Sequence, residues 1–532
     1  MQQFLNDFFM PQNDTDFDIG FIEKKGNENP LVTDLSYDSR TVKNGSLYFA
    51  LPGLHTDGHN FIDKAISNGA LVILHQNVLP EYKDGIVYIR VKDSRFAMSP
   101  VSAAFYKNPS KNITVFGVTG TEGKSTTVYL IFQILKLLGK KAGFISTVQY
   151  SVDGSEQWNE EHQTTPEAPV IHKQLSIMLE NGLEYAVLES SSHGLSFKTN
   201  RLGDVFFDAG IMTNVTHEHL EFHHTWEQYQ SDKANLFRAL DKDFHTKRHG
   251  DVPVFGIVNA DDKSALYFAR STKHKVFTVS VKGIEDADIS VQNIVSTSCG
   301  NTYNARIKSG HSDLEKGVLE DVVLSIEDFL PGAFNAANVL YAMLAAALML
   351  HIPLKQIVPY IKELKPVKGR MTAIEKGQNF EVIVDYAHTP SSFETIFPPI
   401  KNRLKNGAKI ISLFGSAGER DTQKRSEQGK IAAAYSDIIV LCDEDPRGED
   451  PLSILQEIAA GVINENKNFA QNENLFLIPD RPCAIRKAFS LALKNDIVLL
   501  LGKGHENSII YASGTKKYDE IAEAELALDE IV

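Results

Sequence analysis

A glycine-rich turn that ends in a lysine and a serine is the segment of this chain that most clearly points to chemistry. It runs from Gly120 to Ser125, after the apolar run at 113–116. Glycines let backbone N–H groups face an anion at the start of a helix, a lysine reaches β- and γ-phosphates, and a serine hydroxyl binds Mg²⁺. The first glycine of the GxxxxGKS pattern is missing, with Thr119 flanked by Gly117 and Gly120 instead, and such a turn is often accidental on a surface. Its place between a strand and a helix nevertheless predicts a nucleoside triphosphate site. The expected contacts are Gly120, Thr121, Gly123, Lys124, Ser125 and Thr126.

The segments around this turn alternate between strands and helices. Helical spacing covers 126–138, and apolar runs then end at Ser190, Asn214 and Asp262, each followed by a polar loop. This alternation is typical of a doubly wound parallel sheet, whose loops after the strands hold ligands. Residues 275–325 differ, because short alternating runs around a Gly-Asn turn predict a small antiparallel insert.

Two polar linkers divide the chain into three predicted α/β domains. One linker is YKNPSKN at 106–112 and the other is LKPVKGR at 364–370. Short strands such as SLYFALPG precede the first linker, and runs such as EVIVDY and DIVLLLGKG alternate with helices after the second. The last domain is therefore expected to be Rossmann-like. The predicted domains are 1–108, 109–366 and 367–532.

Composition limits the partners of the chain. Its 532 residues carry 54 Lys+Arg against 68 Asp+Glu, a net charge of -14, with 42% hydrophobic and 23% charged residues. This composition is globular, and an acidic chain is a poor partner for nucleic acid. Cys299, Cys442 and Cys483 are too far apart for a disulfide framework or a CxxC metal site, which favours a reducing compartment. Because the N-terminus lacks a basic signal region and the apolar stretch at 339–352 is too short to span a bilayer, we expect a cytoplasmic protein without a membrane partner.

Motifs that belong together lie in all three predicted domains. In chain order they are DSR at 38–40, GSLYFALPGLHTDGHNF at 45–61, GTEGKS at 120–125, ESSSHGL at 189–195, TNVTHEHLEFH at 213–223, YQSDKANLF at 229–237, VNADD at 258–262, VKGRM at 367–371, DYAHTP at 385–390, GSAGERDTQKR at 415–425, DEDPR at 443–447 and GKGHE at 502–506. The set resembles the Mur ligases, and within them the E-type ligases that add a diamino acid to UDP-N-acetylmuramoyl-L-alanyl-D-glutamate in peptidoglycan synthesis. The resemblance implies a central P-loop ATPase domain between an N-terminal UDP-binding domain and a C-terminal amino-acid-binding domain.

The resemblance implies a two-step reaction in which ATP phosphorylates a carboxylate and an amine then attacks the acyl phosphate. The implied catalytic residues are Lys124, Glu189, His219 and Lys233, and the implied Mg²⁺ ligands are Ser125, Glu189, His219 and Lys233, the last as a carbamate. Together they would neutralise charge on the transferred phosphoryl group. Taken alone, Glu189 is equally a strand-end carboxylate, Lys233 a solvated helix charge, and the histidine run at 217–224 a polar loop or a zinc site.

Further nucleotide contacts are implied on either side of the phosphates. Asn335 and Asn338 would bond the adenine end, although both amides equally suit helix capping. Arg370, Asp385 and His388 would reach the nucleotide from the third domain, so that this domain closes over ATP and excludes water.

The donor substrate is implied to contact the first two domains. The matching positions are Ser39 and His59 for the uridine nucleotide, and Thr164, Thr165, Ser191 and Arg201 for the muramoyl-dipeptide. The family usually has an arginine soon after SSHGL, whereas this chain has SFKTN before Arg201. Lys198 is therefore an alternative for the anion-binding role.

The incoming amino acid is implied to bind the third domain, at Arg420, Asp443, Asp445, Arg447, Gly502 and Glu506. An arginine binds a carboxylate bidentately, and Glu506 accepts an ammonium. Members that use meso-diaminopimelate read DNPR, and this chain has Asp445 at the asparagine position. The extra negative charge favours a bare ammonium, as in ornithine or lysine, whereas the retained Arg447 favours a distal carboxylate. Diaminopimelate is slightly preferred on this balance.

The sequence leaves two other functions as alternatives. Folylpolyglutamate synthetases share the ATP domain and the acyl-phosphate chemistry, but the DSR, DGH, DPR and GKGHE segments argue against them. A non-catalytic nucleotide-binding scaffold is opposed by the intact set of Lys124, Glu189, His219 and Lys233. The expected partners are ATP, Mg²⁺, UDP-N-acetylmuramoyl-dipeptide and a free diamino acid, bound by a monomer.

Overall fold

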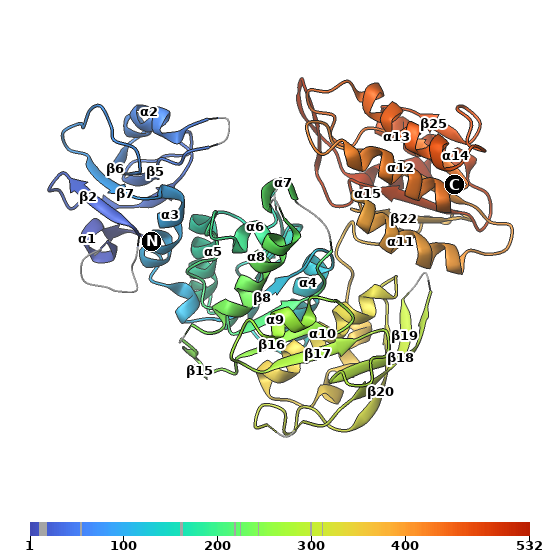
Figure 1. Ribbon diagram of the computed structural model, residues 1–532, viewed down its shortest axis with the longest axis horizontal. Helices are drawn as coiled ribbons and strands as arrows, with labels where there is room; N and C mark the ends of the chain where they lie inside the picture. The colour runs from blue at the N-terminus through green and yellow to red at the C-terminus, as the bar shows by residue number, and fades with distance from the viewer. Residues whose placement is uncertain are drawn as a thin grey trace.

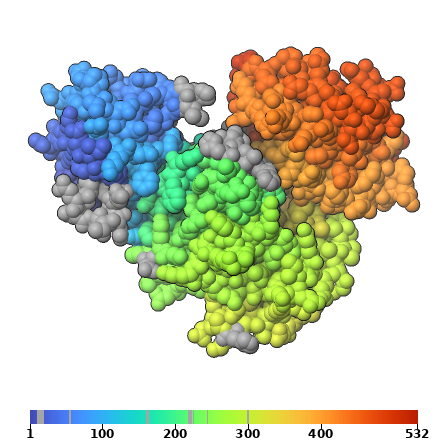
Figure 2. Space-filling model, viewed as in Figure 1, coloured from blue at the N-terminus to red at the C-terminus, as the bar shows by residue number. Residues whose placement is uncertain are grey.

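Three large sheets follow one another along the chain, and each forms the centre of one domain (Figure 1). The computed structural model describes residues 1–532 apart from 10–18, 54–55, 160–162, 217–219, 224, 243, 298–299, 311 and 532. The proposed boundaries near 108 and 366 fall between the sheets. The blue N-terminal and orange C-terminal domains flank the central one, and Figure 2 shows a hollow between them above the central domain.

The N-terminal domain is a five-stranded sheet in the order β2-β7-β6-β5-β4, with helices on both faces. The strands of this sheet are β2 (Phe21–Lys25), β4 (Asp34–Ser36), β5 (Ser46–Phe49), β6 (Ala70–His75) and β7 (Val87–Val91), and β1 (Gln3–Phe4) and β3 (Leu31–Val32) form a separate antiparallel pair. Its helices are α1 (Leu5–Phe8), η1 (Gly58–Phe61), α2 (Ile62–Ser67) and α3 (Ser94–Phe105), and η2 (Pro109–Lys111) lies in the first linker. Strands β4 to β7 are parallel, and only β2 is antiparallel to its neighbour β7.

The central domain is built on an eleven-stranded sheet in the order β11-β10-β9-β12-β8-β13-β16-β17-β18-β19-β20. The strands are β8 (Thr114–Thr119), β9 (Ala142–Ile145), β10 (Gln149–Ser151), β11 (Gln157–Trp158), β12 (Tyr185–Glu189), β13 (Ala209–Met212), β16 (Phe255–Asn259), β17 (Val276–Ser280), β18 (Ile289–Ser296), β19 (Asn301–Ile307) and β20 (Val322–Asp328), with a separate hairpin of β14 (Thr246–Lys247) and β15 (Gly250–Asp251). The six strands from β9 to β17 in this order are parallel. The chain winds first to one side of β8 and then to the other, so the predicted doubly wound sheet is confirmed. Its switch point lies at the end of β8, where such sheets bind ligands.

Helices cover both faces of the central sheet. They are α4 (Lys124–Leu137), α5 (Ala168–Glu180), α6 (Ser192–Leu195), α7 (Leu220–His223), α8 (Trp226–Ala239), α9 (Ala265–Ala269), α10 (Phe334–Leu350), η3 (Leu354–Gln356) and η4 (Val358–Glu363). Helices α4 and α10 pack on one face, and α5 and α8 on the other. The predicted core helix is α10, which is buried almost throughout because it is apolar on all sides.

The predicted antiparallel insert exists, but it is not a separate sheet. Strands β18, β19 and β20 pair antiparallel to one another, while β18 pairs parallel with β17. The insert therefore extends the central sheet, because its apolar side chains join the core beneath α10. Alternating hydrophobicity indicates strands but not which edge they join.

The C-terminal domain has a six-stranded sheet in the order β21-β22-β26-β23-β24-β25. The strands are β21 (Thr372–Ile374), β22 (Glu381–Asp385), β23 (Ile410–Phe414), β24 (Ile438–Leu441), β25 (Leu475–Leu477) and β26 (Ile497–Leu501), with a hairpin of β27 (Ser508–Tyr511) and β28 (Gly514–Lys517). The helices are α11 (Pro390–Arg403), α12 (Gln423–Tyr435), α13 (Pro451–Glu465), α14 (Arg481–Leu491) and α15 (Glu520–Asp529). Within the six-stranded sheet all strands except β21 are parallel, so the loops after β22, β23, β24 and β26 meet at one edge.

No single helix among the described residues is long and apolar enough to cross a membrane. Phe334–Leu350 and Leu354–Glu363 reach the required length only as a pair, and this pair is bent by 115°.

Candidate active site

The glycine-rich turn connects β8 to α4, as the sequence predicts, and its two glycines are required by the space around them. Gly120 has φ +152° and a Cβ there would lie 1.9 Å from Thr213 Oγ1. Gly123 has φ +81° and a Cβ would lie 2.7 Å from Asn338 Oδ1. The first backbone N–H groups of α4 have no partner within the helix, and they lie where a phosphate would bind. The turn therefore fits a nucleotide phosphate group.

Two polar residues after β13 brace the glycine-rich turn. Asn214 Oδ1 accepts hydrogen bonds from the N–H groups of Thr121 (3.1 Å) and Glu122 (2.8 Å). Thr213 Oγ1 donates to Glu122 O at 2.6 Å. Sequence reasoning assigned no role to either residue, although the end of β13 at the switch point was the signal that could have identified them.

Lys124 and Lys233 both reach the turn. Lys124 Nζ donates to Thr121 O and Lys233 Nζ donates to Gly120 O, each at 2.6 Å. Lys233 is only 2% exposed and lies over the Tyr229 ring, so it is not a solvated helix charge. Thr126, the remaining predicted contact, is half-buried in the first turn of α4.

Ser125 and Glu189 form the oxygen-rich part of the site. Ser125 Oγ donates to Glu189 Oε2 at 2.9 Å, and the carboxylate is 3% exposed at the end of β12. Thr147, which sequence reasoning missed, donates to the same oxygen through its N–H (2.8 Å) and hydroxyl (3.0 Å). A fixed carboxylate and a serine hydroxyl beside a phosphate turn are the ligand types that Mg²⁺ prefers. The residues present therefore fit this ion.

The histidine run divides into two parts. His217, His219 and His224 lie outside the described residues, so the predicted metal ligand His219 has no structural account. His223 is buried, with Nδ1 2.8 Å from Asp232 Oδ2 and Nε2 3.0 Å from Ser192 Oγ. Both ring nitrogens are engaged, so His223 itself is not free to bind zinc. Within the described part of the chain, no group of three or more His, Cys, Asp or Glu residues is placed to hold a metal ion.

The two asparagines of α10 lie at the start of that helix beside the glycine-rich turn. Asn335 Nδ2 donates to Pro331 O at 2.7 Å, and Asn338 Nδ2 donates to Asn335 Oδ1 at 2.9 Å. Asn338 Oδ1 accepts from Thr127 Oγ1 at 3.1 Å. The bond from Thr127 ties α10 to α4, and Asn335 holds Asn338 and the segment before α10, so both amides have a structural role in this arrangement.

The residues predicted to hold the dipeptide gather beside Glu189. Thr165 Oγ1 donates to Glu189 O and accepts from the N–H of Ser191, both at 2.9 Å. Arg201 Nη1 donates to Thr165 O at 2.7 Å, and its Nη2 lies 2.8 Å from Glu167 Oε1. Thr164 is half-buried next to this cluster in sequence, whereas Lys198 is exposed. The geometry favours Arg201 over Lys198 at this site.

The two predicted uridine contacts lie in the first domain. Ser39 is buried, and its carbonyl accepts from Asn68 Nδ2 at 2.8 Å. His59 Nδ1 lies 2.6 Å from Asp57 Oδ1, and its Nε2 accepts from the N–H groups of Gln76 (3.2 Å) and Asn77 (3.3 Å). His59 therefore braces the domain with both ring nitrogens.

Asp385, Arg370 and His388 converge at the carboxyl end of β22. Asp385 accepts from the N–H groups of Met371 and Ala387, each at 2.7 Å. Burial raises the pKa of Asp385 to about 6, Arg370 opposes this, and Glu122 of the glycine-rich turn adds to it. Burial lowers the pKa of His388 to about 4, so this ring is neutral at pH 7. The influence of Glu122 on Asp385 indicates that the second and third domains face each other here.

The GKGHE segment packs against the linker and the loop after β22. Gly369 and Gly504 approach so closely that a Cβ on Gly369 would lie 2.3 Å from the carbonyl carbon of Gly504. Tyr386 Oη donates to Glu506 Oε1 at 3.2 Å, and the Arg370 guanidinium lies 4.7 Å from the Tyr386 ring centre. The second linker, the loop after β22 and the GKGHE segment, which are far apart in sequence, thus pack together as one surface of the third domain.

Asp445 has a partner inside the protein, contrary to the free charge expected there. Its Oδ1 accepts from Lys503 Nζ at 2.9 Å and from the N–H of Ile510 at 3.0 Å. Lys503 is fully buried and also pairs with Glu506. The expectation failed because Lys503 lies 58 residues away in sequence and is brought to Asp445 only by the fold.

Three other charged side chains at the carboxyl-end edge of the third sheet have a buried atom without a hydrogen-bond partner. Asp443 Oδ1, Glu444 Oε2 and Arg447 Nε are buried and make no hydrogen bond. Burial raises the pKa of Asp443 to about 6 and also raises the pKa of Glu444. Arg420 is exposed on the neighbouring loop, and Gly502 lies against Glu444, since a Cβ on it would be 3.1 Å from Glu444 Oε2. Sequence reasoning missed Glu444. The edge offers carboxylates and guanidinium groups to a small zwitterion.

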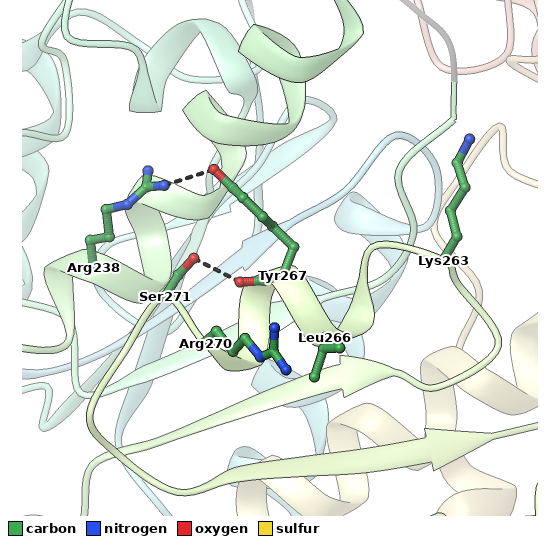
Figure 3. A pocket seen from close by; sticks show the side chains of 6 residues that line it. All are labelled: Arg238, Lys263, Leu266, Tyr267, Arg270 and Ser271. Carbon is green, nitrogen blue, oxygen red and sulfur yellow. Dashed lines mark hydrogen bonds between the residues drawn. The ribbon is translucent and has the colours of Figure 1, made fainter.

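A shallow surface depression of about 570 Å³ lies away from these loops, on α8 and α9 (Figure 3). Its lining residues are Arg238, Lys263, Leu266, Tyr267, Arg270 and Ser271. Arg238 donates to Tyr267 Oη at 3.0 Å. It contains none of the predicted site residues.

The glycine-rich turn, the Ser125–Glu189 pair and the charged edge of the third sheet define a nucleotide-dependent enzyme with three α/β domains. Comparisons with known proteins then identify the family. Residues 31–106 match the model of the Mur ligase family catalytic domain, 118–346 the Mur ligase middle domain, and 369–504 the Mur ligase glutamate ligase domain. The chain belongs to the Mur ligase family, and it is an ATP-dependent ligase that works with Mg²⁺.

Individual relatives cover nearly the whole chain. It is 51% identical to the UDP-N-acetylmuramyl-tripeptide synthetase of Treponema denticola, over 93% of each chain. It is 34% identical to the UDP-N-acetylmuramoyl-L-alanyl-D-glutamate–2,6-diaminopimelate ligase of Geobacillus kaustophilus, over 94% of this chain and 96% of that one. A solved structure of a ligase with the latter name aligns with a TM-score of 0.61 and 25% identity, over 94% of this chain and 95% of the other.

Proposed function

We propose that this chain joins a free diamino acid to UDP-N-acetylmuramoyl-L-alanyl-D-glutamate, as the tripeptide-forming step of peptidoglycan synthesis. The observation that carries the proposal is the charged edge of the third sheet, where buried atoms of Asp443, Glu444 and Arg447 lack partners. Buried charged groups of either sign that lack partners cost free energy unless a ligand binds them. A zwitterionic amino acid supplies an ammonium for the carboxylates and a carboxylate for the guanidinium. The relatives named as tripeptide synthetases support the same reaction.

The reaction needs two bond-forming steps. A carboxylate oxygen of the dipeptide attacks the γ-phosphorus of ATP, which gives an acyl phosphate and ADP. The amine of the diamino acid then attacks the acyl carbon, phosphate leaves with the electron pair of the broken C–O bond, and the amine loses a proton. Mg²⁺ supplies charge neutralisation at the phosphates when it is bound.

The residues of this chain bind, orient and shield the reactants. The N–H groups at the start of α4 and the Lys124 ammonium would bind the phosphates, and Ser125 with Glu189 would hold the ion. His219 and carbamylated Lys233 complete the proposed ligand set. Thr165, Ser191 and Arg201, which lie beside Glu189, would fix the dipeptide carboxylate close to the γ-phosphate.

The third domain provides closure and the acceptor. The charge of Glu122 in the glycine-rich turn acts on Asp385, and the charge of Arg370 acts on both Asp385 and His388, which supports their proposed contact with the nucleotide. Thr216 Oγ1 of the central domain lies 3.3 Å from Ser391 Oγ of the third, so the two domains already touch beside this site. Exclusion of water there would protect the acyl phosphate from hydrolysis.

Among diamino acids, we propose meso-diaminopimelate first. Arg447 makes no ion pair among the described residues and Lys503 neutralises Asp445, so the charge that argued against a distal carboxylate is removed. The alternative, ornithine or lysine, is favoured by Glu444, whose buried carboxylate would accept a bare ammonium. Arg447 would then bind the α-carboxylate instead.

The test is to incubate the enzyme with ATP, Mg²⁺ and UDP-N-acetylmuramoyl-dipeptide, separately with diaminopimelate, lysine and ornithine, and to weigh the products. One strong acceptor is expected, with stoichiometric phosphate release. Product from folate and glutamate alone would favour a folylpolyglutamate synthetase, and absence of turnover with every acceptor would favour a scaffold. Equal use of ordinary mono-amino acids would overturn the pocket at Asp443 and Glu444.

We also propose that the enzyme is a monomer and that it acts in the cytoplasm. All proposed binding segments lie within one chain, and the reaction consumes ATP and a nucleotide-linked substrate. Sedimentation of the purified chain would test the first point.

A further inference from the structure

Arg481 is a fully buried arginine behind the charged edge of the third sheet. It is the first residue of α14, a helix capped by Asp480. Its Nε and Nη2 donate to Glu520 at 2.8 and 2.6 Å, Nη2 also donates to Leu501 O at 2.8 Å, and Nη1 donates to Asp443 O at 3.1 Å and contacts Cys442 Sγ at 3.4 Å. All five N–H groups of the guanidinium are therefore used.

The two carbonyls that Arg481 holds belong to two different strand ends. Asp443 begins the loop after β24 that carries Glu444 and Arg447. Leu501 ends β26 and directly precedes Gly502 and the GKGHE segment. Strand β23 lies between β24 and β26, so no backbone hydrogen bond joins these loops through the sheet. Arg481 bridges them across that intervening strand.

The far side of the guanidinium is anchored just as firmly. Glu520 is fully buried at the start of α15, and its Oε2 accepts from Tyr518 Oη at 2.6 Å. A bidentate arginine–carboxylate pair has a fixed geometry, which fixes the position of the Arg481 guanidinium. Because this guanidinium also binds Asp443 O and Leu501 O, the distance between these two carbonyls is fixed as well. A lysine has the same charge but only three donors on a flexible stem, and it cannot make this set of bonds.

We propose that Arg481 is a positioning residue of the acceptor pocket, which together with the Asp445–Lys503 pair sets the spacing between the Asp443–Glu444 wall and the Gly502–Glu506 wall. The residue does not touch the amino acid. It acts on backbone carbonyls next to the residues that do, so its loss changes acceptor binding without changing the ATP or uridine sites. This inference rests on the proposed function, since it requires the acceptor to bind at this edge.

The same helix offers a matched control. Arg486 also joins α14 to α15, through Glu523 (2.5 Å) and Glu530 (2.6 Å), but it is half-exposed and reaches neither acceptor loop. Arg486→Lys therefore reproduces the weakening of the α14–α15 contact. Arg481→Lys adds the loss of the bridge between the loops.

The experiment compares the KM of wild type, Arg481→Lys and Arg486→Lys for each of the three substrates, with circular dichroism to confirm folding. We expect Arg481→Lys to raise the KM for the diamino acid about tenfold or more, because displacements of about 1 Å already have such effects. Its KM for ATP and for the UDP-linked dipeptide should stay at the wild-type values, and Arg486→Lys should match wild type throughout. Calorimetric titration of the amino acid into each full-length protein, with a non-hydrolysable ATP analogue present, should show the same loss.

An unchanged acceptor KM in folded Arg481→Lys, or an equal rise in all three KM values, would overturn the inference. If Arg481→Lys does not fold, Glu520→Gln takes its place, because it keeps the guanidinium and weakens its anchor. The same selective rise in acceptor KM is then required. Wild-type enzyme that accepts no diamino acid would refute the proposed function itself, which is a different result from a variant that matches wild type.

Discussion

Lys503 Nζ lies 2.9 Å from Asp445 Oδ1 in a buried pair, so the aspartate of the DEDPR motif that replaces the asparagine of DNPR is neutralised by the lysine of the GKGHE motif. Burial opposes the charge on Lys503, but Glu506 and Asp445 raise its pKa above its ordinary value. The pair joins the two acceptor motifs and leaves Asp445 no free charge for a substrate. Acceptor preference must then depend on Glu444, Asp443 and Arg447.

Asp445→Asn should therefore change stability more than specificity. The amide retains an acceptor for the N–H of Ile510 but leaves the buried Lys503 with Glu506 as its anionic partner, at a cost of about 1–3 kcal/mol. Thermal unfolding should show this loss. In competition between diaminopimelate and lysine, the variant should keep the wild-type preference, and a reversed preference would show that Asp445 contacts the acceptor.

Glu444→Gln should instead change acceptor binding more than stability. Its unpartnered Oε2 beside Gly502 is proposed to accept the acceptor ammonium. The neutral amide should therefore raise the acceptor KM about 10- to 150-fold, which corresponds to the loss of a charged hydrogen bond of about 1.5–3 kcal/mol. The KM for ATP should not change. Glu427→Gln on the exposed face of α12 is the control, and a Glu444 variant with the same kinetics as this control would refute the assignment.

Acceptor binding should weaken in acid because of Asp443. Burial raises its pKa to about 6, a hydrogen bond from Tyr511 and the charge of Arg481 oppose this, and Asp480 and Asp450 add to it. The carboxyl is thus ionised above pH 6 and neutral below, so the acceptor KM should rise as pH falls, by about tenfold at one unit below the pKa. Asp443→Asn should bind weakly at every pH, and the ratio of wild-type to variant KM isolates this titration from that of other groups. A ratio that is constant between pH 5 and 8 would contradict the prediction.

Lys124→Met should remove ATP-dependent turnover. The methionine fills similar space but supplies no cation to the phosphates, and loss of such a group lowers kcat about 10²–10³-fold. Lys136→Met, on the exposed side of the same helix, should retain wild-type turnover. Measurement of ADP release from both variants tests the prediction, and normal release from Lys124→Met would place the phosphates elsewhere.

Lys233→Ala should lower turnover as severely, and added bicarbonate should not restore it, because a carbamate needs the side-chain amine. Loss of the bond to Gly120 O removes a brace of the glycine-rich turn as well. Arg238→Ala, an exposed position on the same helix, serves as the control. Activity close to wild type in Lys233→Ala would exclude the proposed role in metal binding.

The sequence alone determined the elements and the local chemistry of this protein. The strand before Gly120 and the helix after it, the parallel strands that end at Glu189 and Asp385, and the core helix α10 all follow from hydrophobic period and glycine placement, which are local signals. The order of motifs was likewise sufficient to indicate the family.

Only the tertiary structure decided which charges are free. Asp445 and Lys503, Arg481 and Asp443, and Asn214 and the glycine-rich turn are each far apart in sequence, and their pairing depends on strand order and on the loops that a parallel sheet brings to one edge. A residue type states what a side chain is able to bond. Its partner is set by the fold, because buried polar groups must be satisfied by whatever the packing places within reach.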